Sequence, residues 1–271
     1  MRQTLLVMLL LLLTVPASTL YSDTTGDSAR AAIEKLGSAI VWVKHTQPYE
    51  DWDGSVLTRE SQTIGIFIDR KGTLVVRGHI ALRDLVPYGF RVQWPDGTEA
   101  EAEYLGKDKN LNICFCRLKQ PLPDTVAHFE LGNTPTPVIA QKVFILTRRQ
   151  QWDGSAFEVA EGRIASILPG ARAACILSIP NAESFAGCPV FNEKGVFLGV
   201  IGFDLYQEEG GPAGAHPGYS LLYPGYSIAA ASPVKPDSVQ PGAGMGWIGA
   251  VVGSVEEKMA RYLKQIGRAH V

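Results

Sequence analysis

Short apolar runs separated by turn residues dominate the chain from about residue 39 onward. Gly, Pro, Asn, Asp and charged residues bound these runs, a pattern typical of β-strands joined by tight turns. One short helix is expected before them, at Ser28–Leu36. The predicted strands are Ala39–Val43, Thr63–Ile68, Thr73–Val76, Phe90–Trp94, Thr98–Leu105, Asn112–Leu118, Val143–Leu146, Ala160–Ile167, Cys175–Ile179, Pro189–Phe203 (with a turn at 193–195) and Gly225–Ala230. Because no helices alternate with them, the pattern favours an all-β sandwich or a pair of barrels.

The N-terminus has a different pattern. Residues 1–20 carry an early arginine, an apolar run from Leu5 to Leu13 and then small residues, which is the layout of a secretory signal peptide. The run is too short to span a bilayer. We therefore expect an exported protein, periplasmic or extracellular, with no stable membrane span after cleavage. Residues 206–226 are expected to form an exposed loop, and residues 237–245 a Pro/Gly linker.

Composition narrows the function classes. The chain has 271 residues, 46% hydrophobic and 19% charged, which is enough for one large or two small domains with a core. Its net charge of -2 leaves no basic excess to neutralise phosphates, so a nucleic-acid partner is not expected. No Cys or His spacing indicates zinc, and no metal or cofactor is expected. The spacing of the cysteines does not select a disulfide pairing, and buried free thiols are the favoured interpretation for Cys114, Cys116, Cys175 and Cys188.

Several short segments, collinear along the chain, resemble the trypsin-like protease domain of the HtrA/DegP family. They are Thr63–Asp69, Gly78–Ile80, Trp94–Gly97, Tyr104–Asp108, Leu131–Asn133, Glu161–Ser166 and Gly187–Val190. The resemblance covers about residues 31–236. It implies an all-β fold of two antiparallel six-stranded barrels, one at about 31–120 and the other at about 124–236. Their cleft would bring His79 and Ala186 face to face.

The resemblance also assigns the positions of a catalytic triad. His79 falls at the base position, Asn112 at that of the carboxylate and Ala186 at that of the nucleophile. The oxyanion-hole positions fall on Ser184 and Ala186. Alanine has no group that can attack a carbonyl, and asparagine lacks the charge that stabilises an imidazolium. Since Ser184 stands where the family has glycine, we expect a collapsed oxyanion hole and an inactive site.

Other side chains could in principle restore the chemistry. Ser184 would need the following strand to slip by two residues, and Cys188 lies at a buried turn position; neither is the favoured nucleophile. Because both triad partners of His79 are replaced, we expect it to be a structural histidine and not a working base. Surface or turn roles are the expectation for the remaining candidates, Asp108, Asp124, His128 and His216.

We therefore expect a pseudoprotease that binds unfolded or extended polypeptide by strand addition along the cleft, or that assembles with active HtrA-like relatives. The family's trimers imply a homo- or hetero-trimer. A serine-type endopeptidase of protein quality control and a structural envelope component are the alternatives. Residues 246–265 resemble the first strand and helix of a PDZ domain, and residues 266–271 resemble a translated sequencing adapter. We interpret this as a PDZ domain that a sequencing artefact has truncated. The alternative is that these residues form a genuine tail helix.

Overall fold

The chain is described in a computed structural model. It places residues 24–51, 54–81, 85–108, 111–150, 154–168, 173–180, 182–203 and 220–231. The expected signal peptide, linker, PDZ-like segment and terminal artefact lie outside these residues, as does His216. No helix in the described part of the chain is long and apolar enough to cross a membrane.

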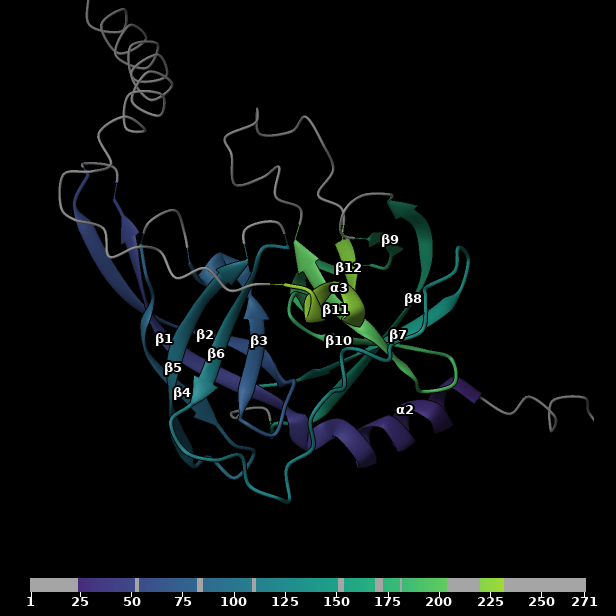
Figure 1. The fold of residues 1–271 in the computed structure, drawn as a ribbon, viewed down its shortest axis with the longest axis horizontal. Coiled ribbons are helices and arrows are strands. Elements are labelled where there is room, and N and C mark those ends of the chain that lie inside the picture. Colours follow the sequence, from purple (N-terminus) through teal and green to yellow (C-terminus); the bar gives the residue numbers. More distant parts are fainter. Residues whose placement is uncertain are drawn as a thin grey trace, which may run out of the picture. The chain divides into compact units, whose positions relative to one another are not determined.

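Twelve strands of the described residues form two closed antiparallel barrels of six strands each (Figure 1). Barrel one contains β1 (Ile40–Glu50), β2 (Val56–Phe67), β3 (Thr73–Arg77), β4 (Tyr88–Gln93), β5 (Glu99–Asp108) and β6 (Ile113–Leu118). Barrel two contains β7 (Lys142–Arg148), β8 (Phe157–Leu168), β9 (Ala174–Ser178), β10 (Pro189–Asn192), β11 (Phe197–Phe203) and β12 (Ser220–Pro224). The all-β prediction is confirmed, and the architecture matches a trypsin-like double barrel.

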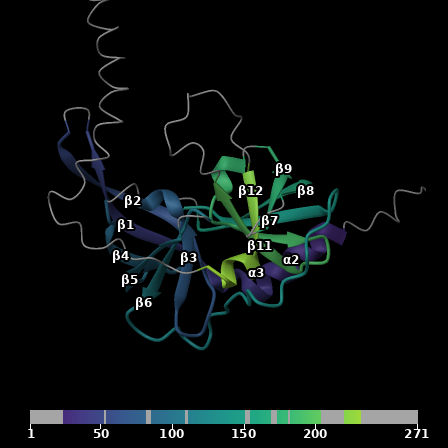
Figure 2. The same ribbon diagram turned by 45° about the horizontal axis from the view of Figure 1, so that its top comes forward.

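Barrel one closes in the order β1-β2-β3-β6-β5-β4, and barrel two in the order β10-β11-β12-β9-β8-β7. Figure 2 shows the two sets of strands from a second direction. The interior of barrel one is packed by Val43, Leu74 and Val76, which are fully buried. A Cβ added to Gly65 would lie 2.8 Å from Cγ2 of Val43 and 3.0 Å from Cγ1 of Val76. Glycine at this point of β2 therefore lets the neighbouring strands' side chains fill the barrel.

Helix α2 (Thr24–Leu36) precedes the barrels and begins before the expected Ser28. Asp27 in its first turn and Lys35 in its last complement the helix dipole. Its buried face includes Ala29 and Ala32, and the hydroxyl of Thr25 accepts a hydrogen bond from Nζ of Lys142 on β7 at 2.8 Å. The 3-10 helix η2 (Gly37–Ala39) then leads into β1.

A buried arginine joins this N-terminal segment to barrel two. Arg148, at the end of β7, donates from Nε to the carbonyl of Ile40 at 3.0 Å, from Nη2 to Gly37 at 2.9 Å and from Nη1 to Ser155 at 3.0 Å. Its guanidinium also lies 4.1 Å from the centre of the Phe157 ring. A buried cation is thereby satisfied by three backbone dipoles and one aromatic face.

The final strand of barrel two differs from the prediction. The apolar run Gly225–Ala230, expected to be a strand, is the short helix α3 (Gly225–Ala229), whereas β12 lies within the segment expected to be a loop. A Cβ on Gly225 would overlap Thr134, and the N–H of Tyr226 donates to the Thr134 hydroxyl at 3.1 Å. This close approach to the 131–134 loop turns the chain out of the sheet after Pro224.

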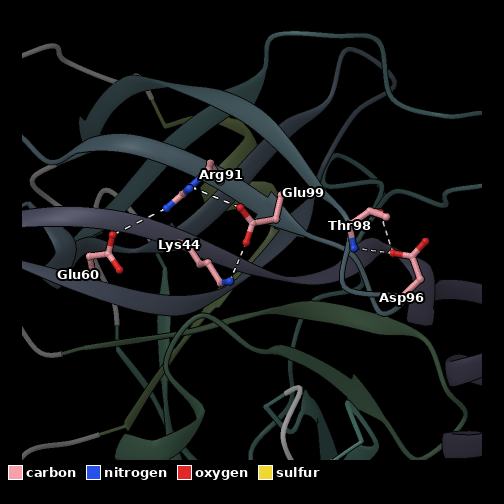
Figure 3. Close-up of polar contacts among 6 residues, drawn as sticks. All are labelled: Lys44, Glu60, Arg91, Asp96, Thr98 and Glu99. Carbon is pink, nitrogen blue, oxygen red and sulfur yellow. Dashed lines mark hydrogen bonds and ion pairs between the residues drawn. The ribbon is translucent and has the colours of Figure 1, made fainter.

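The outer face of barrel one carries a run of alternating charges across neighbouring strands (Figure 3). Glu99 accepts a hydrogen bond from Nζ of Lys44 at 2.6 Å and pairs with Nε of Arg91 at 3.5 Å, and Nη2 of Arg91 lies 3.9 Å from Glu60. Such cross-strand pairs are worth about 0.2–1 kcal/mol each. In the same view, Asp96 accepts the N–H and hydroxyl of Thr98 and closes the β4–β5 turn. These pairs link β1, β2, β4 and β5 on the outside of barrel one.

Candidate active site

The position of His79 is fixed by main-chain contacts at the end of β3. Gly78 and His79 belong to the 3-10 helix η3 (Gly78–Ile80), which the N–H of Ala81 closes on the Gly78 carbonyl at 3.1 Å. The carbonyl of His79 accepts a hydrogen bond from Nε2 of Gln47 on β1 at 2.9 Å. The N–H of Gly78 donates to the carbonyl of Asn112 at 2.8 Å. The base position is thus held between β1 and the residue that precedes β6.

Asn112 occupies the expected carboxylate position but makes no polar side-chain contact there. It is 1% exposed, and its φ of 47° lies in the left-handed region, which asparagine tolerates better than most residues. Both side-chain amide atoms are buried and have no hydrogen-bond partner, and Nδ1 of His79 is likewise buried without a hydrogen bond. An orienting carboxylate would accept a hydrogen bond from that nitrogen. Asn112 therefore does not orient the imidazole, and its unsatisfied amide costs about 1–3 kcal/mol.

Ala186 lies in a tight turn that packs against the loop of His79. The turn follows the 3-10 helix η5 (Ala182–Phe185), and Ala186 itself is buried. Gly187 has a φ of 86°, and a Cβ there would lie 3.1 Å from the carbonyl of Ile64 and 3.5 Å from the nitrogen of Arg77. The structure therefore brings the predicted nucleophile turn of barrel two against barrel one, two residues before His79.

The backbone before Ala186 is helical, which affects the expected oxyanion hole. Each N–H of a 3-10 helix points toward the carbonyl three residues before it. Ser184 is exposed within η5 and Ala186 follows η5 directly. The N–H of Gly187 donates to the carbonyl of Ile201 on β11 at 2.7 Å, and the N–H of Cys188 donates to the Phe185 carbonyl at 2.9 Å. The N–H groups within η5 are therefore directed along the helix, and those of Gly187 and Cys188 already have acceptors, whereas an oxyanion hole needs free N–H groups that converge on one point.

Cys188 has the wrong environment for a nucleophile. Its side chain is fully buried, and this burial raises the pKa of the thiol to about 12, partly opposed by a hydrogen bond with the side chain of Thr147. The thiolate is the reactive form, so a thiol with such a pKa is inert near neutral pH. Cys114, Cys116 and Cys175 are also buried, and all four cysteines are free. The prediction of buried free thiols is confirmed.

The other candidate residues differ in their surroundings. Asp108, expected at the surface or in a turn, is instead the buried last residue of β5, and it accepts the N–H of Leu111 at 3.1 Å. Asp124 is exposed, and His128 lies in the loop between β6 and β7. Within the described ranges, no three His, Cys, Asp or Glu side chains cluster as metal ligands would.

A polar cluster beside His79, inside the mouth of barrel one, was not predicted from the sequence. Oε1 of Gln47 accepts hydrogen bonds from Nη2 and Nε of Arg59 at 3.0 and 3.3 Å. His45 is 2% exposed, stacks on Phe90 at 5.6 Å, and has no hydrogen bond to either ring nitrogen. Burial, with smaller contributions from Arg77 and Arg59, lowers the pKa of His45 to about 4. The only sequence signal was the alternation that places residues 41, 43, 45 and 47 on the same face of β1.

A pocket of about 560 Å³ lies on barrel two, outside this site. Its lining includes Ile139, Lys142, Glu161, Arg163 and Ser178. Lys142 and Glu161 pair with each other at 3.1 Å, and Nη1 of Arg163 donates to the carbonyl of Ala140. The charges that line the pocket are thus already partnered, and the pocket contains none of the triad positions.

Comparison with known proteins adds no closer identification. No protein-family model matches the chain, and no curated protein is significantly similar to it.

Proposed function

We propose that the protein is an exported, catalytically inactive relative of the HtrA-type serine proteases that binds extended polypeptide or assembles with active relatives. The observation that carries the proposal is Ala186. The turn packed against Arg77, beside His79, presents a methyl group where a nucleophile is required.

The surroundings of Ala186 support the loss of chemistry. Asn112 is uncharged and makes no hydrogen bond to His79, Cys188 is buried with a raised pKa, and Ser184 lies exposed in η5. Triad members act as a unit, so the loss of one alone removes most of the rate enhancement. Here two of the three differ.

A free strand edge supports binding of extended polypeptide. β2 pairs with β1 along its length from Val56 to Ile66, but with β3 only from Gly65 to Phe67. In the described strands, residues 56–62 therefore have no partner on their second edge, and Figure 1 shows the β1–β2 hairpin extending beyond its neighbours. Exposed main-chain groups on such an edge can pair with an added strand. Val56 and Leu57 add exposed apolar side chains, 59% and 41% accessible.

Assays on unfolded casein test both parts of the proposal. We expect no cleavage by the wild-type chain above the level of a His79→Ala variant, because neither protein has a nucleophile. We also expect the immobilised wild-type chain to retain unfolded casein. A folded protein of similar charge, applied in place of casein, should not be retained. Cleavage that disappears in His79→Ala would support a serine endopeptidase instead. Failure to retain unfolded casein would favour a structural envelope component.

A further inference from the structure

Two arginines converge on the His79 loop from different strands. Arg77 ends β3, and its Cβ lies 3.9 Å from the position that a Cβ would take on Gly187 in the nucleophile turn. Arg59 lies on the free edge of β2 and reaches the same loop through Gln47, which accepts from Arg59 at 3.0 Å and donates to the His79 carbonyl at 2.9 Å. Arg77 therefore leads directly into the His79 loop, and Arg59 is linked to the same loop by a hydrogen-bond chain through Gln47.

Arg77 has hydrogen-bonding capacity that the protein does not use. Its Nε is buried and meets no acceptor, and none of the described ion pairs or side-chain hydrogen bonds involves its terminal nitrogens. Burial, together with the charge of Arg59, lowers the pKa of the Arg77 guanidinium. Because a desolvated cation without a counter-ion is unfavourable, a bound anion would stabilise it.

Arg59 also retains donors toward solvent. The Nε and Nη2 atoms of Arg59 donate to Gln47, and the Arg59 guanidinium lies 5.6 Å from the centre of the Tyr49 ring. Nη1 of Arg59 is left for a ligand. The adjacent Glu60 points to the opposite face of β2, where it pairs with Arg91 (Figure 3). At residue 112, where a protease would place a carboxylate, the side chain is neutral. Two positive charges therefore lie beside the His79 loop, and neither forms an ion pair with an acid of the described residues.

We propose that Arg77 and Arg59 bind a carboxylate side chain of the polypeptide that this cleft takes, so that the protein selects acidic extended segments. This inference rests on the proposed function. Guanidinium groups bind carboxylates through paired, charge-assisted hydrogen bonds. A strand added to β2 would place alternate side chains beside those of β2, within reach of Arg59.

Fluorescence anisotropy with two matched peptides tests the proposal. One is an extended peptide in which Glu alternates with Thr, and the other has Gln at every Glu. We expect the Glu peptide to bind about 10-fold more tightly, as the loss of one charge-assisted hydrogen bond implies, and this advantage to shrink as salt is raised. Arg77→Gln and Arg59→Gln should each reduce the preference. Arg91→Gln removes the same charge from the outer face of barrel one and should leave it unchanged.

The possible outcomes separate this inference from the function on which it rests. Equal binding of both peptides, unaffected by either substitution in the cleft, would overturn the acidic preference and leave polypeptide binding intact. Binding of neither peptide would count against both. A third outcome is that neither peptide binds, while inorganic phosphate binds the wild-type chain but not Arg59→Gln. This result would identify Arg77 and Arg59 as a site for a small anion and would overturn the proposal. Arg59 is exposed, so its variant keeps the test decisive if Arg77→Gln does not fold.

Discussion

The N–H of Gly78 donates a hydrogen bond to the carbonyl of Asn112 across 2.8 Å, while the side-chain amide of Asn112 bonds to nothing. The two loops that would carry the base and the carboxylate of a protease are therefore joined by their main chains alone. Such a contact does not depend on the charge of residue 112. The approach of these two loops is therefore independent of the side-chain chemistry at residue 112.

Gly78→Ala should destabilise the protein by about 3 kcal/mol. A Cβ at residue 78 would overlap the side-chain oxygen and the carbonyl of Asn112, and that backbone cannot move without breaking the start of β6. Urea denaturation measures the change. Gly132→Ala is the matched control, because a Cβ at residue 132 meets no atom within 4 Å. Equal stability of the two variants would show that the loops are not in close contact.

Arg148→Lys should cost about 3 kcal/mol in the free energy of unfolding. A lysine cannot reproduce the guanidinium fork that reaches Gly37, Ile40 and Ser155, so buried carbonyls would be left unsatisfied. Arg149→Lys is the control, since the neighbouring side chain makes an exposed pair with Glu158. Thermal denaturation of both variants, at one pH and salt concentration, provides the comparison. A loss no larger in Arg148→Lys than in Arg149→Lys would contradict a stabilising role for the buried guanidinium.

The buried His45 should make the protein less stable in mild acid. Its pKa is about 4 when folded, against 6.5 for the ordinary side chain, so the unfolded chain binds a proton that the folded chain excludes. The stabilisation is therefore complete above pH 6.5 and is lost as pH falls toward 4, by up to about 3 kcal/mol. His45→Phe, which keeps a ring stacked on Phe90, should flatten this dependence. The measurement is the urea midpoint of wild type, His45→Phe and the control His128→Gln between pH 4 and 6.5. If the midpoint of His45→Phe depends on pH as steeply as that of wild type, His45 is not the group responsible.

The sequence pattern predicts the fold because most strands of both barrels alternate or are continuously apolar. In β5, the run Glu99-Ala100-Glu101-Ala102 alternates exposed and buried positions as a half-buried strand should. The outer half of the β1–β2 hairpin is mostly polar and lacks regular alternation, so both strands were predicted too short. β12 was missed because its neighbours are rich in Gly and Pro, while the apolar run of α3 resembled a strand.

The site could be predicted only in part, for a related reason. Local motifs mark the positions of His79, Asn112 and Ala186, because each follows or precedes a recognisable strand. The arginines beside them depend on pairing between distant residues: Gln47 lies opposite Arg59 across the hairpin, and Arg77 meets Gly187 from the other barrel. Register and barrel packing are tertiary properties, so no local pattern could identify this cluster.

Restoring the triad side chains should not restore catalysis. We expect the double variant Asn112→Asp with Ala186→Ser to remain unlabelled by a fluorophosphonate probe, as the wild-type chain should be. The helical backbone of η5 directs N–H groups along the chain, and each missing oxyanion donor costs about 100- to 1000-fold in rate. Labelling is read by mass spectrometry, with the double variant carrying His79→Ala as the control. Labelling that depends on His79 would show that the N–H groups do converge in the cleft, and that the two substituted side chains alone account for inactivity.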